Sequence, residues 1–169
     1  MKLNIQTLKN EGTMTFEEKT QVSLQNMHVS TNQRDYEVGV CGQVTRKGEL
    51  YTVCGFVDIT LKLFCDRCMA EVLCPVHAEV FCEFSPSQKY LDEDEDIQPV
   101  TKSSIDLSNT ILESIAMNLP MKVLCKEDCQ GMCKKCGVNL NHEACKCEGF
   151  DIDPRLEQLK DIFRVSNGK

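Results

Sequence analysis

The chain has 169 residues, of which 41% are hydrophobic, 27% charged and 6% aromatic, and it contains no tryptophan. Its net charge of −7 excludes a protein that binds nucleic acid or anionic membranes nonspecifically over its whole surface. The scarcity of aromatic residues also argues against a surface built mainly for stacking on bases.

The charge and the cysteines set further limits. Residues 92–96 are five consecutive acids, and the net charge without them is −2. The rest of the chain can therefore still carry a local basic patch. Residues 1–10 lack the apolar segment of a signal peptide, and no apolar run approaches the ~18 residues of a membrane span. We therefore expect a cytoplasmic protein without a membrane partner. Its twelve cysteines stay reduced there, and clustered reduced cysteines most often bind metal.

Residues 1–84 are predicted to form an antiparallel β-domain. Apolar and polar residues alternate in three runs separated by short turns, which is the period-two pattern of half-buried strands. The runs cover residues 36–44, 51–63 and 70–80. Residues 2–34 are expected to add one or two strands, and Gly55 to mark a bulge.

The second half of the chain is predicted to be less regular. Residues 85–103 have the composition of an acidic linker or loop. Within residues 104–120, a short strand at 104–107 is expected to rejoin the sheet, followed by a helix that Ser108 caps and Pro120 ends. The remaining segments are a cysteine-rich zinc module at 121–150 and a C-terminal helix and tail at 151–169. The predicted fold class is α+β, a mainly antiparallel β-sheet domain with one or two helices and this small zinc module.

The cysteine-rich segment predicts a structural Zn²⁺ site. Its six candidate ligands are Cys125, Cys129, Cys133, Cys136, Cys145 and Cys147. Two residues between Cys133 and Cys136 let a tight turn aim both sulfurs at one ion, and the glycine that follows relieves crowding. Either of the other two pairs would complete a tetrahedral set, and His142 is a weaker candidate. An all-thiolate site is usually closed, which favours a folding role over a catalytic one.

A further pair, Cys65 and Cys68, lies in the turn between two predicted strands. Three interpretations stay open: half of a second zinc site completed by cysteines of the strands, part of one site with Cys133 and Cys136, or a redox or structural pair without metal. The strand cysteines are expected to be small buried residues, namely Cys41, Cys54, Cys74 and Cys82. Candidate RNA contacts are Arg67 at the turn and Lys134 and Lys135 in the knuckle.

The order of these motifs resembles the YceD family of bacteria and plastids. The shared features are Cys65-Asp66-Arg67-Cys68-Met69, the acidic loop, Ile105-Asp106-Leu107, Leu119-Pro120, and the cysteine pattern that continues to Asp153-Pro154-Arg155-Leu156. The resemblance covers residues 36–165. It implies a bacterial cytoplasmic protein linked to accumulation of 23S ribosomal RNA and to assembly of the large ribosomal subunit. It brings no catalytic residues to this chain.

Three functions compete. The first is a non-enzymatic ribosome-biogenesis factor that binds ribosomal RNA, a ribosomal protein or an assembly factor. The second is a zinc-containing adaptor for a basic ribosomal protein or nuclease, which the acids at 92–96 favour. The third is a ribonuclease or redox enzyme, and it is disfavoured because the sequence shows no carboxylate cluster and no nucleophile–base pair with catalytic spacing. We therefore expect neither enzymatic activity nor a small-molecule substrate.

Overall fold

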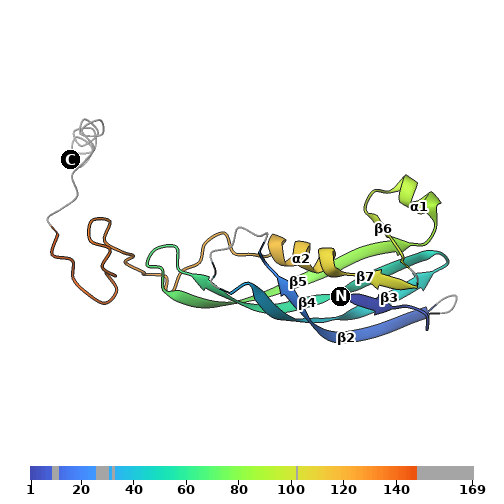
Figure 1. The fold of residues 1–169 in the computed structure, drawn as a ribbon, viewed down its shortest axis with the longest axis horizontal. Coiled ribbons are helices and arrows are strands. Elements are labelled where there is room, and N and C mark those ends of the chain that lie inside the picture. Colours follow the sequence, from blue (N-terminus) through green and yellow to red (C-terminus); the bar gives the residue numbers. More distant parts are fainter. Residues whose placement is uncertain (9–11, 26–30, 32, 102, 148–169) are drawn as a thin grey trace, which may run out of the picture.

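The computed structural model describes residues 1–8, 12–25, 31, 33–101 and 103–147. A five-stranded sheet dominates it, in the order β2-β3-β4-β5-β6 (Figure 1). The strands are β2 (Gly12–Ser23), β3 (Asp35–Lys47), β4 (Leu50–Phe64), β5 (Glu71–Ser85) and β6 (Ile97–Pro99). The first four are antiparallel neighbours, and β6 runs parallel to the end of β5.

The remaining elements are short. They are β1 (Lys2–Asn4), α1 (Gln88–Glu93), β7 (Ser104–Asp106) and α2 (Ser108–Met117). Strands β1 and β7 form a separate two-stranded sheet, and α2 packs on one face of the large sheet against β5 and β4. The prediction of a mainly β fold with one or two helices is confirmed. Neither described helix has the length and apolar composition that a membrane span needs.

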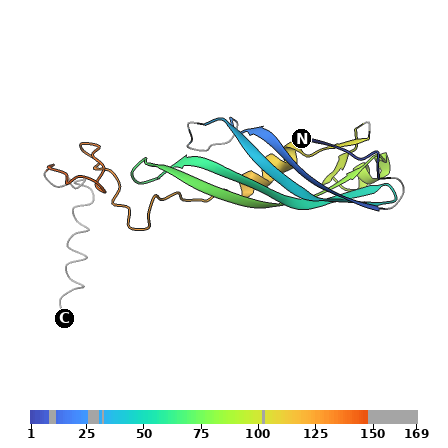
Figure 2. The same ribbon diagram turned by 90° about the horizontal axis from the view of Figure 1, so that it is seen from below.

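The core lies between α2 and the inner face of the sheet, which is the face toward α2. Alternation along each strand turns most of its apolar residues to this side. Ile111 and Ile115 of α2 are fully buried against it, and burial of each stabilises the fold by about 1.5–3 kcal/mol. This packing fixes the long β4–β5 hairpin, whose tip reaches beyond the core (Figure 2).

The sheet contains a close approach between Gly42 of β3 and Gly55 of β4. These two residues pair directly in a continuous register. A Cβ built on Gly42 would lie 2.4 Å from the carbonyl oxygen of Cys54, and one built on Gly55 would lie 2.3 Å from that of Cys41. The bulge expected at Gly55 is therefore absent, and the glycine serves instead to let two backbones approach.

Other parts differ from the sequence prediction. The segment 85–103, expected to be a linker or loop, contains α1 and the edge strand β6. The strand predicted at 104–107 does not rejoin the large sheet, because β7 pairs with β1. Ser108 is the first residue of α2 and not its cap; its backbone N–H and its hydroxyl both donate to Asp106 Oδ1, at 3.0 and 2.6 Å.

After α2, the chain runs toward the β4–β5 hairpin and continues beyond its tip (Figures 1 and 2). The described part of the predicted cysteine-rich module, residues 121–147, contains no named helix or strand. Its only isolated bridge within the described residues joins Met132 to Asn139. The helix predicted in 151–169 lies outside the described residues.

Candidate metal centres

The tip of the β4–β5 hairpin presents two cysteines to one side. The Cys65 N–H donates to the Ala70 carbonyl at 2.8 Å, and the Met69 N–H donates to the Cys65 carbonyl at 2.9 Å. Met69 takes a positive φ of 58° to close this turn. The result is a knuckle in which Cys65 and Cys68 are both buried.

The chain after α2 docks onto this tip through paired hydrogen bonds. The Asp66 N–H donates to the Val123 carbonyl at 2.9 Å, and the Val123 N–H donates to Asp66 Oδ2 at 2.7 Å. Arg67 Nη1 donates to the Cys129 carbonyl at 2.8 Å. These bonds carry Cys125 and Cys129 to the hairpin cysteines.

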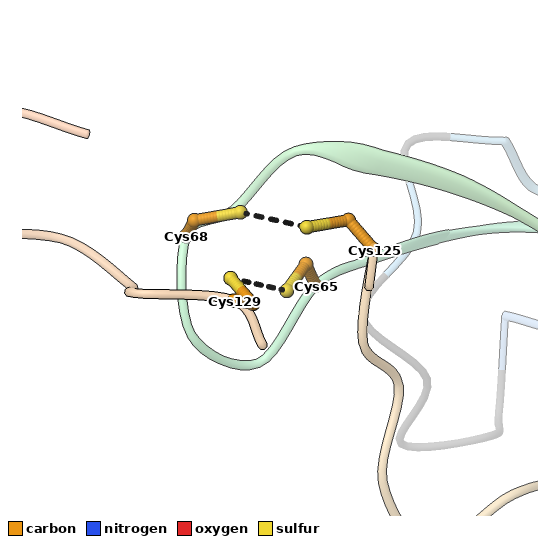
Figure 3. A group of neighbouring side chains, drawn as sticks. All are labelled: Cys65, Cys68, Cys125 and Cys129. Atoms are coloured by element: carbon orange, nitrogen blue, oxygen red, sulfur yellow. Dashed lines mark hydrogen bonds between the residues drawn. The ribbon is translucent and has the colours of Figure 1, made fainter. Parts of the chain in front are cut away.

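Four sulfurs converge there, and we call this group the hairpin tetrad: Cys65, Cys68, Cys125 and Cys129 (Figure 3). The sulfurs of Cys65 and Cys129 are 3.8 Å apart, and those of Cys68 and Cys125 are 3.5 Å apart. A tetrahedral zinc with sulfur at about 2.3 Å requires sulfurs about 3.8 Å from one another. The hairpin tetrad therefore fits one zinc-sized ion.

A second group, the C-terminal tetrad, comprises Cys133, Cys136, Cys145 and Cys147. The Cys145 sulfur lies 3.2 Å from that of Cys133 and 3.6 Å from that of Cys136. The Gly137 N–H donates to the Cys133 carbonyl at 2.8 Å, and Gly137 has a φ of 74°, so glycine suits this turn. This local geometry is that of a zinc knuckle closed by a second cysteine pair.

The two tetrads differ in burial. Three members of the hairpin tetrad are buried and only Cys125 is exposed. In the C-terminal tetrad only Cys133 is buried, whereas Cys136 and Cys147 are exposed. The C-terminal tetrad is therefore the more accessible of the two to solvent and reagents.

Hydrogen bonds favour the thiolate form of cysteines in both tetrads. Burial opposes ionisation of Cys65, but the N–H groups of Arg67, Cys125 and Cys68 outweigh it and lower the pKa of Cys65 to about 6. The N–H of Cys136, together with the Cys145 side chain, lowers the pKa of Cys133 to about 6. Each tetrad is thus prepared to offer an anionic sulfur.

The neighbouring thiols show the opposite effect. Desolvation and the sulfur of Cys68 raise the pKa of Cys125 to about 12, and the sulfurs of Cys145 and Cys136 raise that of Cys147 to about 12. Several thiolates in one group repel one another, so complete ionisation requires a cation among them. A soft divalent ion such as Zn²⁺ has the charge and the ligand preference to supply that compensation.

The C-terminal tetrad is one of the two ligand sets considered from the sequence, whereas the partners of Cys65 and Cys68 differ from every arrangement considered. The six cysteines of the C-terminal segment do not converge on one ion, because Cys125 and Cys129 lie with the hairpin pair. The number of cysteines could have indicated two sites, since eight cysteines in four close pairs suit two tetrahedral metal ions. Their partnership depends on the docking of residue 123 on Asp66, which no spacing reveals.

The remaining candidates lie outside the tetrads. His142 is exposed and belongs to neither group. The strand cysteines likewise join neither; Cys82 is buried as expected, whereas Cys41, Cys54 and Cys74 are only half-buried.

The predicted RNA contacts have different surroundings. Arg67 is exposed, but its guanidinium binds the Cys129 carbonyl and so helps to join the hairpin to the next segment. Arg67 and Lys134 line a shallow hollow of about 480 Å³ that also contains Asp66 and Asp128. Lys135 is exposed in the knuckle. The hollow therefore has mixed charge.

Comparison with known proteins identifies relatives of this chain. The model of the family described as "Large ribosomal RNA subunit accumulation protein YceD" matches residues 53–163, which include all eight cysteines of the two tetrads. An uncharacterized protein of Mycobacterium tuberculosis is 30% identical over 102 residues, covering 59% of this chain and 49% of the relative. No solved structure matches.

Two plant proteins are also similar. Both are named large ribosomal RNA subunit accumulation protein YCED homolog 1, chloroplastic. The Zea mays protein is 30% identical over 82 residues, covering 44% of this chain and 28% of the relative. The Arabidopsis thaliana protein is 31% identical over 64 residues, covering 38% and 20%. The chain spans about half or less of the length of these curated relatives.

Proposed function

Because the chain belongs to the YceD family of large ribosomal RNA subunit accumulation proteins, we propose that it is a non-enzymatic ribosome-biogenesis factor. In this role it supports the synthesis, processing or accumulation of 23S ribosomal RNA by binding RNA or a ribosomal partner. The observation that carries the proposal is the family match over residues 53–163. The resemblance noted in the sequence is confirmed by that match.

The proposal includes one Zn²⁺ in each tetrad. The four sulfurs of each group lie within 4.8 Å of one another, and all donors are thiols, which suits zinc. Bound zinc would hold the segment after α2 on the hairpin tip and shape the knuckle beyond it. Four thiolates fill a tetrahedral coordination sphere, and a filled sphere leaves no position for a substrate or an activated water. The donor set thus supports a structural role.

The proposed setting is the cytoplasm, where reducing conditions keep these thiols available to metal. The partners are ribosomal, and the residues around the tetrads offer both signs of charge for contact. Arg67 has a positioning role in this proposal, because its guanidinium already joins the hairpin to Cys129. Lys134 and Lys135 are the proposed RNA-facing residues of the knuckle.

Depletion in the organism that encodes the protein tests the proposal. The ratio of large-subunit to small-subunit ribosomal RNA should fall, and expression of the wild-type chain should restore it. A variant with Cys129→Ser and Cys145→Ser, which removes one ligand from each tetrad, should restore it poorly. Cys74→Ser, outside both tetrads, is the matched control and should restore it fully. An unchanged RNA ratio after depletion would refute the proposed function.

A further inference from the structure

The face of the large sheet opposite α2, here called the outer face, carries large apolar side chains in solvent. Phe56 of β4 is 42% exposed, and Leu73 and Phe81 of β5 are 66% and 68% exposed. In Figure 2, α2 lies behind the strands. Alternation explains the position of these residues, because their sequence neighbours Val57, Cys74 and Val80 turn toward the core.

These side chains border two adjoining hollows. One, of about 500 Å³, is lined by Phe56, Phe81, Cys41 and Cys54 among others. The other, of about 760 Å³, is lined by residues that include Leu73 and His77. The rings of Phe56 and His77 stack with their centroids 5.0 Å apart, so a residue of one hollow contacts a residue of the other. The two hollows together are called the groove.

Small residues form the floor of the groove. Cys54 lies opposite Phe81 in the β4–β5 register, and Cys41 lies opposite Phe56 in the β3–β4 register. Both cysteines are half-buried, unlike the buried positions expected of them. Their short side chains leave room between the phenylalanines that an apolar side chain of a partner would fill.

The border of the hollow around Phe56 and Phe81 is acidic, whereas Lys19 and Lys62 line the other hollow together with acids. Glu79 pairs with Phe56 across β4 and β5, and Glu17 lies in the same row beyond Cys41. Asp58, which lines the larger hollow, accepts from His77 at 2.7 Å. Lys19 donates to Glu37 at 2.9 Å, and this carboxylate balances the positive charge of Lys19. In the described part of the chain, no lysine or arginine lines the hollow around Phe56 and Phe81.

The carboxylates around the groove indicate which of several possible partners fits it. A nucleic acid would bring phosphates against these carboxylates, and a second copy of this chain would bring the same carboxylates against themselves. A basic protein segment with apolar side chains satisfies both the exposed rings and the acids. We propose that the outer face of the sheet docks such a segment of a ribosomal or assembly protein, with Phe56 and Phe81 as its anchors. This inference rests on the proposed function for the class of partner.

The test uses the zinc-loaded full chain and a short peptide in which lysine and leucine alternate. Binding is measured by titration calorimetry, and the contact is located by amide chemical shifts. The peptide should shift residues around Phe56 and Phe81, and Phe81→Ser should weaken binding by about tenfold or more, as for an interface anchor. A peptide in which serine replaces leucine should bind at least about tenfold more weakly, because it keeps only the charge.

Met117→Ser supplies the matched control. Met117 is 86% exposed on α2, away from the outer face, so this variant should bind as the wild type does. Glu79→Gln should weaken binding most at low salt, since its contribution is electrostatic. Far-UV circular dichroism checks that each variant is folded, which the exposure of Phe81 leads us to expect.

Three results would overturn the proposal. One is equal affinity of wild type and Phe81→Ser for the lysine–leucine peptide. Another is binding of an oligouridylate that Phe81→Ser abolishes, which would make the groove an RNA site. The third is self-association of the wild type that Phe81→Ser removes, which would make a second copy the occupant.

The proposed function and the docking proposal can be refuted independently of each other. A chain with Phe56→Ser and Phe81→Ser should not restore the RNA ratio after depletion, whereas Met117→Ser should. Full restoration by the double variant refutes the docking proposal and leaves the proposed function intact. An RNA ratio that never falls on depletion refutes the proposed function, while the peptide titration still decides whether the groove binds a basic apolar segment.

Discussion

The side-chain amide of Asn141 donates a hydrogen bond to the sulfur of Cys129 across 3.3 Å. Asn141 belongs to the loop between Cys136 and Cys145 of the C-terminal tetrad, whereas Cys129 belongs to the hairpin tetrad. The Oδ1 atom of Asn141 also accepts from the Gln130 N–H at 3.0 Å. The loop of one tetrad therefore supports a ligand of the other, and the two proposed metal sites are physically coupled.

Asn141→Ala should weaken zinc binding by the hairpin tetrad. The amide stabilises the Cys129 thiolate and lowers its pKa despite the opposing effect of burial. Loss of such an outer partner of a metal ligand typically costs about tenfold to 100-fold in affinity. Competition with a chromophoric chelator should show one of two zinc equivalents weakened to this extent. The neighbouring His142→Ala, whose side chain is exposed, should leave both equivalents unchanged, and equal affinities in the two variants would contradict the coupling.

Metal analysis of the reduced protein should give two zinc ions per chain. Cys129→Ser and Cys145→Ser should each lower this to one, because each removes one ligand from a different tetrad. Cys54→Ser lies outside both tetrads and should keep two. A single zinc in the wild type that survives Cys129→Ser would show that only the C-terminal tetrad binds metal. This result would remove the hairpin site from the proposal.

The metal-free reduced protein should titrate about two thiolates per chain near pH 6. Cys65 and Cys133 have pKa values of about 6 against an ordinary 9.0, because N–H groups donate to their sulfurs. Since the folded pKa is the lower one, the stabilisation is complete above the unfolded pKa near 9 and is lost as the pH falls through about 6. Ultraviolet thiolate absorbance should show the two steps, and Cys65→Ser or Cys133→Ser should each remove one.

The control for this titration is Cys74→Ser, because Cys74 belongs to neither tetrad. It should leave the absorbance change near pH 6 unaltered. An absorbance that develops only above pH 8 in the wild type would contradict the lowered pKa values.

The elements that local pattern determines were predictable, and those that depend on distant contacts were not. Alternation over 36–80 located β3, β4 and β5, because each residue's side of the sheet follows from the period of two. The spacing of Cys133 and Cys136 likewise indicated a knuckle. The partners of Cys65 and Cys68 were not predictable, because the docking of Val123 on Asp66 joins residues 57 positions apart.

A similar limit applies to single residues with two interpretations. Gly55 suggested a bulge, since glycine within a strand often marks one, but it faces Gly42 across a regular ladder. The sequence pattern predicted that Cys41 and Cys54 are small buried residues, yet the strand register turns them outward to the floor of a groove. To predict the role of such a residue, one must know which residue lies opposite it on the neighbouring strand, and only the strand pairing shows this.

Gly42→Ala should strongly destabilise the sheet. The new Cβ would lie 2.4 Å from the Cys54 carbonyl oxygen and 2.7 Å from the Cα of Gly55, and both neighbours are backbone atoms of a central strand. The strands must separate to admit the methyl group, at a cost of about 1–3 kcal/mol in the free energy of unfolding. Urea denaturation of the zinc-loaded protein would measure this difference. Gly39→Ala, on the same strand, is the matched control, because its Cβ would lie an ordinary 3.9 Å from the nearest atom. Its effect should stay within about 0.5 kcal/mol, as for most substitutions away from tight contacts. Equal stability of the two variants would show that the backbones at Gly42 and Gly55 separate at little cost.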